Sequence, residues 1–339
     1  MKILENVLIS TLTTMRIGGV AKYVIEIETP EDIPEAYSFA LEHNLPTFIL
    51  GGGANTIGHD EGYDGAILLN KIKGIRIVDE DDTSMTITGM GGEVWDDFVE
   101  YATEKNLSGI EALSSIPGTL GAAPVQNIGA YGQDVSQTLV SVEAYDSLID
   151  EFVTIPKDKM EMGYRKTIFN SGETKGRYFI YAVTVKLAKN KTLTPPFYTS
   201  LQKYVDDNNI TDFSPKNIRK MVAEIRAGKL PDPKEFASAG SFFKNVYVDD
   251  AEADRAEKNG IKVWRDGTCN KINSGWLIEN AGLSGKEFYG MEVSDKASLV
   301  LINKNAKGYD DLDKARKEIR KVIKEKYGYE LEQEPVEII

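Results

Sequence analysis

Residues 239–245, Ala-Gly-Ser-Phe-Phe-Lys-Asn, place Ser241 between a glycine and two phenylalanines. A serine that acts as a nucleophile needs a neighbouring base, most often a histidine, to accept its proton. The chain has two histidines, His43 and His59, and neither lies near Ser241 in the sequence. The hydroxyl therefore serves either a chemistry that needs no histidine or a helix or turn cap, a position that serine often occupies.

Residues 50–56, Leu-Gly-Gly-Gly-Ala-Asn-Thr, directly follow a predicted strand. Glycines let the backbone approach a bulky anion and expose its N–H groups to it. Gly51 and Gly53 match the first two glycines of the Rossmann dinucleotide fingerprint, but Thr56 stands where the third glycine belongs. A tight turn explains an isolated run of glycines equally well.

A second glycine-rich stretch, residues 114–135, combines glycine, alanine and proline with almost no charge. Small residues at this density indicate a backbone that packs closely against something flat or against another backbone. A crossing within the core would explain one such stretch. Two of them in one chain favour a large flat cofactor that carries a diphosphate, a description that FAD fits.

Two further places carry charge that could act on a substrate. Arg165 lies in the largely apolar and aromatic residues 163–170, where it is either a surface residue with a buried stem or a clamp for a carboxylate. Near the chain end, residues 331–335 carry Glu332 and Glu334, which would share one face of an extended strand. Acidic residues after a last helix are more often a solvated tail.

Alternating strand and helix patterns surround these stretches. Hydrophobic periodicity predicts strands at residues 23–28, 47–50, 66–69, 84–88, 139–145, 178–187 and 298–303. It predicts helices at residues 29–44, 94–105, 214–227 and 311–327. Thr29 is the expected N-cap of the first helix, with Pro30 in its first turn. Residues 188–214 are polar, and we expect them to be irregular.

The bulk composition limits the classes of function. A net charge of −13 argues against nucleic acid as a partner, because phosphate backbones would be repelled. The single cysteine, Cys269, cannot form an internal disulfide, which favours the cytosol. The sequence contains no long apolar run and no signal-peptide pattern, so we expect no membrane association. So few histidines and cysteines also argue against a zinc site.

Eight segments, in this order, together resemble the UDP-N-acetylenolpyruvoylglucosamine reductase family, flavoenzymes of bacterial peptidoglycan precursor synthesis. They are TTMRIGG, ILGGGANT, IPGTLGAAPVQNIGAYG, GYRKTIF, KLPDP, AGSFFKN, GWLIENAGLSG and the terminal LEQE. They span nearly the whole chain. The resemblance implies that NADPH and bound FAD reduce an enolpyruvyl ether to a lactyl ether, in a monomeric cytoplasmic enzyme.

The resemblance also implies an α+β architecture. Residues 1–228 would form a PCMH-type (vanillyl-alcohol-oxidase-like) two-part FAD-binding fold, split near residue 70. Residues 229–339 would form a smaller C-terminal α+β substrate domain, whose last segment returns to the active site. The Lys-Leu-Pro-Asp-Pro break that begins at Lys229 independently predicts a boundary there.

Roles for single residues follow from the same resemblance. Ser241 would protonate the substrate carbanion, Arg165 would bind the substrate carboxylate, and Glu334 would stabilise the enol or relay a proton. The substrate would also contact Tyr131, Tyr198, Lys229 and Asn245, with Tyr198 closing over it as in the type I members. FAD would contact Leu50, Gly51, Gly52, Gly53, Ala54, Asn55, Thr56, Ile116, Pro117, Gly118, Gly121, Gln126, Asn127, Ile128, Gly129 and Ala130.

The chain departs from the family pattern at several positions. Ala54 stands where the family often has serine, and Ser294 where many members have histidine. Gln333 and Pro335 stand where proline and valine are common, so the choice of Glu334 depends on counting from Leu331, with Glu332 as the alternative. A flavin oxidase on the same fold and a nucleotide-sugar-binding protein without turnover are the alternative interpretations.

Overall fold

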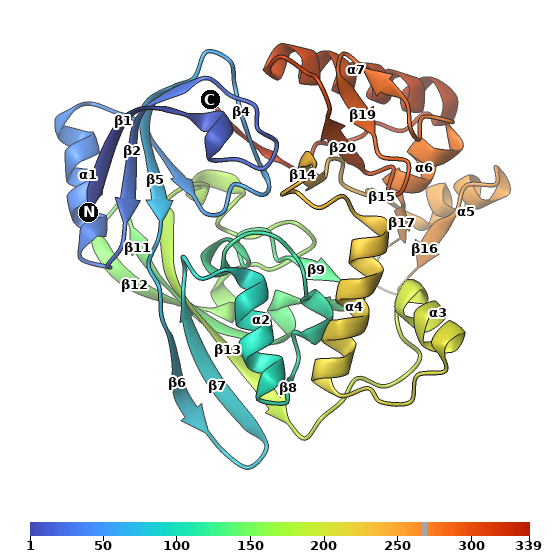
Figure 1. The fold of residues 1–339 in the computed structure, drawn as a ribbon, viewed down its shortest axis with the longest axis horizontal. Helices are drawn as coiled ribbons and strands as arrows, with labels where there is room; N and C mark the ends of the chain where they lie inside the picture. The colour runs from blue at the N-terminus through green and yellow to red at the C-terminus, as the bar shows by residue number, and fades with distance from the viewer. Residues whose placement is uncertain (266–269) are drawn as a thin grey trace. The chain divides into compact units, whose positions relative to one another are not determined.

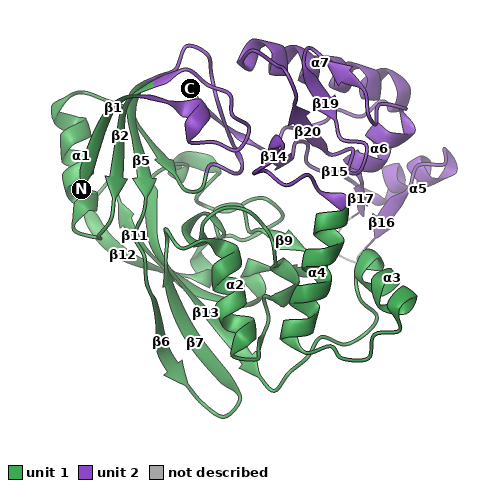
Figure 2. Ribbon diagram, in the orientation of Figure 1, with its two compact units in different colours: residues 1–6, 21–52, 64–228 green, residues 7–20, 53–63, 229–339 purple. Residues whose placement is uncertain are grey.

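The computed structural model describes residues 1–265 and 270–339, so Cys269 lies outside the described residues. Strands and helices alternate along the chain, and the predicted α+β class is confirmed (Figure 1). The chain divides into two compact units (Figure 2). Unit 1 contains residues 1–6, 21–52 and 64–228, and unit 2 contains residues 7–20, 53–63 and 229–339.

The first sheet of unit 1 has four strands. Their order is β1 (Lys2–Leu8), β2 (Val20–Ile27), β5 (Tyr63–Asn70) and β3 (Thr47–Leu50). The helix α1 (Asp32–Glu42) buries Ile33, Ala36 and Ala40 in a cluster with apolar residues of these strands. Because β3 pairs in parallel with the buried strand β5, the glycines after Leu50 emerge at the carboxyl end of an edge strand.

The first helix begins at Asp32, three residues after the expected N-cap, so the prediction that Thr29 caps it is wrong. The carboxylate of Asp32 accepts hydrogen bonds from the N–H groups of Glu28 and Thr29, at 2.8 and 2.9 Å. These bonds close a turn over residues 28–32, and the helix starts only after that turn.

The second sheet of unit 1 has six strands. Five follow the order β12 (Glu151–Pro156), β11 (Leu139–Asp146), β13 (Tyr178–Lys189), β7 (Ser84–Met90) and β6 (Ile75–Glu80), and β8 (Leu107–Ser108) pairs with β13. The helix α2 (Trp95–Glu104) buries Phe98, Val99 and Ala102 in the core of this sheet. Burial of the apolar face of α2 against the sheet therefore also fixes the position of the N-terminus of this helix.

Residues 188–214 are not wholly irregular, as the sequence suggested, because α3 (Thr199–Asn208) forms within them. Leu201 and Val205, one helical turn apart, are buried in a cluster with apolar residues of α4 (Pro215–Lys229). The polar composition concealed this two-residue apolar stripe, which stabilises a helix only when a partner helix covers it.

Unit 2 contains two small antiparallel sheets, besides a parallel pair of strands described below. One has the order β14 (Ala237–Ser241), β20 (Val300–Asn303), β19 (Met291–Val293) and β18 (Glu287–Phe288). The other has the order β15 (Val246–Val248), β17 (Asn270–Ile272) and β16 (Val263–Arg265). Its helices are α5 (Asp250–Lys258), α6 (Ser274–Asn280) and α7 (Tyr309–Tyr327). Gly328, with a φ of 81°, ends α7 as expected.

Unit 2 is discontinuous in sequence. It begins its longest segment at Lys229, but it also contains residues 7–20 and 53–63. The strand β4 (Thr56–Gly58) pairs in parallel with β21 (Val336–Ile338), and Ile57 is buried in the main core of the unit. A single domain boundary at residue 229 therefore does not describe unit 2, which also takes up two earlier segments of the chain.

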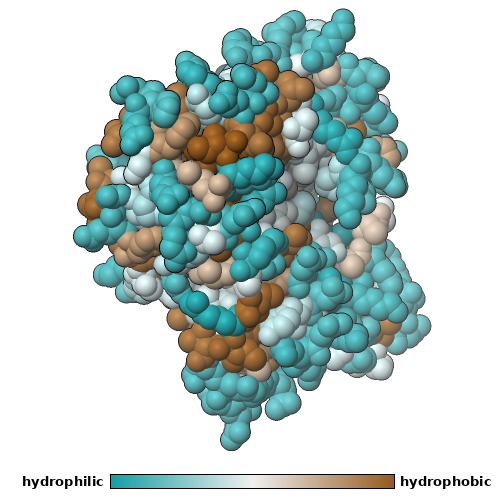
Figure 3. Space-filling model, turned by 60° about the vertical axis from the view of Figure 1, so that its left-hand side comes forward, coloured by the Kyte–Doolittle hydropathy of each residue, from teal (hydrophilic) through white to brown (hydrophobic). Residues whose placement is uncertain are grey.

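The visible face in Figure 3 is largely hydrophilic, with hydrophobic side chains gathered in separate patches. Exposed apolar side chains include Ile77 and Val78 of β6 and Phe152 of β12. Within the described residues, the helices are all too short or too polar to cross a bilayer.

Candidate functional site

The two glycine-rich stretches meet inside unit 1. A Cβ atom on Gly51 would lie 2.4 Å from the Thr119 Oγ1 atom, and one on Gly52 would lie 3.1 Å from the Gly118 Cα atom. Side chains at residues 51 and 52 would therefore collide with the second stretch. The two stretches are therefore in direct contact, and the glycines do not form an isolated tight turn. We refer to residues 51–52 and 116–119 together as the candidate diphosphate groove.

The hydroxyl of Thr119 supports the same interpretation. Its Oγ1 atom is buried and has no hydrogen-bond partner among the residues that the structure describes. An unsatisfied buried hydroxyl costs about 1–3 kcal/mol, so such groups usually find a partner. A phosphate oxygen beside Gly51 and Gly52 would accept this hydrogen bond. The residues present thus fit the diphosphate of FAD.

Asn127 ties the second glycine-rich stretch to the residues around Arg165. Its backbone is left-handed, with a φ of 45°. Its side chain accepts a hydrogen bond from the Ser136 N–H at 3.0 Å and donates one to the Gly163 carbonyl at 3.3 Å. The strand β9 (Gly129–Ala130) then pairs with β10 (Gln133–Asp134) in a short hairpin. The predicted FAD contacts at residues 126–130 thus belong to one cross-linked loop.

Gly121 has a different environment. A Cβ atom there would lie 2.9 Å from the carbonyl oxygen of Ile180 and 3.0 Å from the Cα atom of Gly91. Close packing of the backbone against β13 explains a glycine at this position without a cofactor. Its predicted contact with FAD stays a prediction.

Arg165 lies beside the loop that contains Asn127. Its Nη1 atom is 3.5 Å from the Asn127 carbonyl oxygen, and its guanidinium lies 5.2 Å from the ring centre of Tyr164. The backbone at Arg165 is left-handed, with a φ of 53°. Residues held in such conformations cluster at functional sites, where surrounding contacts enforce them. The half-buried guanidinium is therefore placed by its neighbours rather than left as a solvated chain.

Tyr131 and Tyr198 come together although they are far apart in sequence. Their ring centres are 6.0 Å apart and the planes cross at 83°, an edge-to-face contact. Burial raises the pKa of Tyr131, and the guanidinium of Arg226 opposes that shift. Tyr198 directly precedes α3 and keeps 47% of its surface exposed, so it can still contact a ligand.

Ser241 and Glu334 lie on neighbouring segments of unit 2. Ser241 ends the strand β14, so it is not a helix cap. The Glu334 N–H donates a hydrogen bond to the Phe242 carbonyl at 2.9 Å, and the Lys244 N–H donates one to the Glu332 carbonyl at 2.8 Å. The acidic chain end is therefore not a free tail but a segment paired with residues 242–244.

The two glutamates of this segment differ in environment. Glu332 keeps 72% of its side chain exposed and forms an ion pair with Lys244. Glu334 is half-buried. Asn245, just beyond, accepts a hydrogen bond from the Ser274 N–H at 3.2 Å, and Lys229 is the first residue of the long segment of unit 2. This difference favours Glu334 over Glu332 for a role in chemistry.

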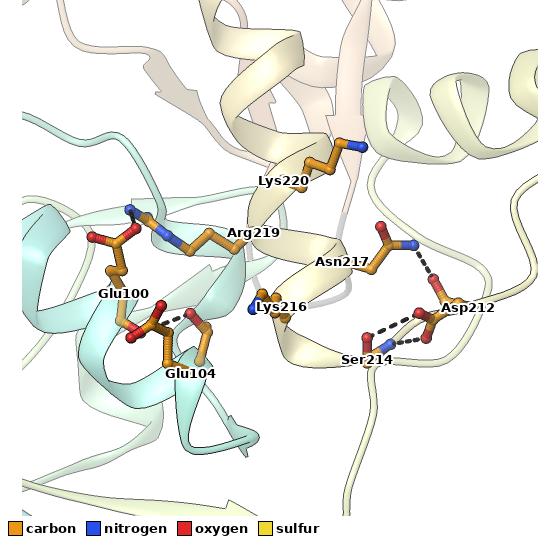
Figure 4. Close-up of a pocket in the computed structure, with 9 residues that line it drawn as sticks. Glu100, Glu104, Asp212, Ser214, Lys216, Asn217, Arg219 and Lys220 are labelled. Carbon is orange, nitrogen blue, oxygen red and sulfur yellow. Dashed lines mark hydrogen bonds and ion pairs between the residues drawn. The ribbon is translucent and has the colours of Figure 1, made fainter.

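A hollow lies between α2 and α4 in unit 1 (Figure 4). Carboxylates and cations line it together, including Glu100, Glu104, Lys216 and Arg219, and Arg219 lies 3.5 Å from Glu100. Because acidic and basic side chains balance each other in this hollow, its net charge does not favour either an anionic or a cationic ligand. Within the described chain, this hollow contains none of the predicted site residues.

Family models match both parts of the chain. A model described as the FAD binding domain matches residues 21–148, which include both glycine-rich stretches. A model of the UDP-N-acetylenolpyruvoylglucosamine reductase C-terminal domain matches residues 232–338. The reductase of that name from Bdellovibrio bacteriovorus is 35% identical over 330 residues, covering 97% of either chain. The chain belongs to the UDP-N-acetylenolpyruvoylglucosamine reductase family.

Further comparisons agree with this membership. A reductase from Flavobacterium johnsoniae is 34% identical over 338 residues, covering 98% of this chain and 99% of the relative. The crystal structure of UDP-N-acetylenolpyruvylglucosamine reductase from Thermus caldophilus matches with a TM-score of 0.67 over 99% of both chains. Its sequence identity of 22% supports the fold alone. The resemblance, the FAD-binding domain and the fold class expected from the sequence are confirmed.

Two of the departures from the family pattern, Ser294 and Gln333, form local hydrogen bonds. The hydroxyl of Ser294 accepts a hydrogen bond from the Ala297 N–H at 3.3 Å, within a turn. Gln333 accepts a hydrogen bond from Arg316 at 2.5 Å and donates one to Glu337 at 3.0 Å. The Gln333 side chain thus anchors the segment that carries Glu334. Ala54 offers no side-chain donor, which leaves backbone N–H groups and the Thr119 hydroxyl for the diphosphate.

Proposed function

We propose that this chain reduces UDP-N-acetylglucosamine enolpyruvate to UDP-N-acetylmuramate, with FAD as bound cofactor and NADPH as reductant. The observation that carries the proposal is full-length membership of the reductase family, with 97% of the chain aligned to a curated reductase. The groove at Gly51 and Gly52 and the pairing of residues 242–244 with the Glu334 segment support it.

Arg165 binds the carboxylate of the enolpyruvyl group. When bound, reduced FAD supplies a hydride to the outer carbon of the substrate double bond. Negative charge then develops on the inner carbon and on the carboxylate, as an enolate. The planar guanidinium of Arg165 can donate two parallel hydrogen bonds to that carboxylate. Stabilisation of a developing oxyanion is usually the largest contribution to catalysis.

Ser241 donates its hydroxyl proton to the inner carbon. A carbanion is basic enough to accept a proton from a hydroxyl, so no histidine is needed to activate this serine. A positioned proton donor contributes roughly 10²- to 10⁴-fold to the rate. The Glu334 N–H donates a hydrogen bond to the carbonyl of Phe242, the residue after Ser241. The Glu334 side chain stabilises the enol form or relays a proton.

The remaining predicted residues hold the rest of the substrate. Tyr131 and Tyr198 cover it with their paired rings, while Lys229 and Asn245 bind its diphosphate and sugar. The proposal includes a monomeric enzyme in the cytoplasm, and it requires neither nucleic acid nor a membrane.

Separate measurement of the two half-reactions tests the proposal. The purified protein should be yellow, NADPH should bleach it, and the enolpyruvyl sugar nucleotide should restore the colour. A yellow protein that transfers electrons only to oxygen or to another acceptor would instead indicate a different flavin enzyme. A colourless protein that binds the sugar nucleotide would indicate a binding protein without turnover.

Ser241→Ala separates the two half-reactions. Reduction of the flavin by NADPH should persist, because Ser241 takes no part in it. Reoxidation by the enolpyruvyl substrate should slow by roughly 10²- to 10⁴-fold. Equal loss of both half-reactions would contradict the proton-donor role.

A further inference from the structure

Ser115 directly precedes the groove residues and has an unusual backbone. Its φ of 59° is left-handed, a conformation that is unfavourable for a residue with a side chain. No glycine relieves this cost at residue 115. Such a conformation persists only where surrounding contacts enforce it, and it is often found where a functional segment must be held in place.

Two charged side chains form hydrogen bonds with the backbone of Ser115, one with its N–H and one with its carbonyl. The Asp96 carboxylate accepts a hydrogen bond from the Ser115 N–H at 2.5 Å. The Nε atom of Arg226 donates a hydrogen bond to the Ser115 carbonyl at 3.2 Å. Hydrogen bonds to charged groups stabilise a structure more than neutral ones do. Together they can offset the cost of the left-handed conformation.

Both side chains are themselves fixed. Arg219 donates two hydrogen bonds to the Asp96 carboxylate, at 2.5 and 3.0 Å. Burial alone would raise the pKa of Asp96, but the bonds from Arg219 and Ser115 outweigh it and the pKa is lowered. Arg219 and Arg226 are seven residues apart on α4, so they lie on the same face of that helix.

The same contacts reach the groove. Three residues after Ser115, the Gly118 carbonyl accepts a hydrogen bond from the Trp95 N–H at 3.1 Å, and Gly118 packs against Gly52. Thr119, with its buried unpartnered hydroxyl, comes next. Residues 115–119 are thus attached to the start of α2 at two points and to α4 at one.

We propose that Asp96 and Arg226 are positioning residues that hold Ser115 in its left-handed conformation and so fix residues 116–119 for the FAD diphosphate. The inference rests on the proposed function, because it takes FAD as the ligand of the groove. Arg226 also interacts with Tyr131, one of the residues proposed to contact substrate. Its guanidinium therefore links the FAD groove with the substrate side of unit 1.

Titration of the apoprotein with FAD, followed by flavin fluorescence, tests the positioning role. Asp96→Asn and Arg226→Gln should each weaken FAD binding by roughly 10- to 100-fold, the equivalent of one charged hydrogen bond. Asp146→Asn is the matched control. Asp146 is also a buried carboxylate held by two hydrogen bonds from one arginine, Arg177, but it lies in β11. The Asp146→Asn substitution should lower the Tm of the apoprotein and leave its affinity for FAD unchanged.

Ser115→Gly supplies the second test. Glycine adopts a φ of 59° without strain, so Ser115→Gly in the Asp96→Asn background should recover most of the lost affinity. An unchanged FAD affinity in Asp96→Asn and Arg226→Gln would overturn the inference. Failure of Ser115→Gly to restore binding, or an equal loss of affinity in Asp146→Asn, would also overturn it. A wild-type apoprotein that binds no FAD would contradict the proposed function itself.

Discussion

Gly53→Ala should destabilise unit 2 far more than an alanine at an ordinary left-handed glycine. Gly53 has a φ of 64°, and a Cβ atom there would lie 2.0 Å from the Leu12 carbonyl oxygen. Ordinary contacts of a Cβ atom begin at 3.4 Å, so either the backbone of residues 12–14 or that of the loop must move. The left-handed conformation costs roughly 1–2 kcal/mol and the overpacking about 1–3 kcal/mol more.

Gly282→Ala is the matched control for that variant. Gly282 belongs to the same unit and has a φ of 73°, and among the described residues nothing lies within 4 Å of the Cβ position. It should therefore show the conformational cost alone, about 1–2 kcal/mol. The difference between the two variants measures the collision with Leu12.

Urea unfolding of the apoprotein provides the assay, with the fluorescence of Trp264 and Trp276 reporting on unit 2. Gly53→Ala should lower the free energy of unfolding by about 1–3 kcal/mol more than Gly282→Ala. Equal losses for the two variants would show that the loop around Gly53 yields easily. The argument that close backbone packing requires glycine there would then be wrong.

Three further predictions concern the site and its surroundings. Tyr198→Phe should raise KM for the enolpyruvyl substrate about 2- to 10-fold, the equivalent of one neutral hydrogen bond, with little change in kcat; an unchanged KM would remove the proposed covering role. Glu334→Gln should lower kcat by roughly 10²- to 10⁴-fold, whereas Glu332→Gln, whose ion pair with Lys244 is exposed, should leave kcat near wild type. If steady-state assays instead show a large loss of kcat in Glu332→Gln and little change in Glu334→Gln, the catalytic role belongs to Glu332. The hydrogen bond from Arg177 lowers the pKa of Asp146 below its ordinary value of 3.8. The ionised Asp146 therefore stabilises the folded state at pH values above 3.8, and this stabilisation is lost as the pH falls through the lowered pKa. Asp146→Asn should therefore have a lower Tm than wild type at about pH 7, and the difference should shrink below about pH 4; a constant difference in thermal melts would contradict this.

The strands and long helices were largely predictable because their signals are local. The strand predicted at 47–50 coincides with β3, and the last helix ends at Gly328 as expected. Leu201 and Val205 show the limit. Scattered apolar residues in a largely polar segment indicate a helix only once the apolar residues of α4 are known to cover them.

Candidate residues for the site were also recognisable by type, since glycine runs, a lone arginine and a serine in an apolar setting stand out in a sequence. The residues that hold them were not recognisable. Asp96 and Arg226 look like ordinary charged residues on helix surfaces, and only the fold brings both to the backbone of Ser115. No sequence signal marks a serine whose backbone is left-handed.

The sequence by itself determined which residues could perform the chemistry, the order of the family motifs, and the approximate places of most strands and helices. The tertiary structure decided which segments belong together. It placed residues 53–63 and the terminal strand in one unit through the pairing of β4 with β21, and it set the Glu334 segment against residues 242–244. Local patterns depend on neighbours within a few residues, whereas these contacts join residues far apart in the chain, and only packing of the whole unit selects them.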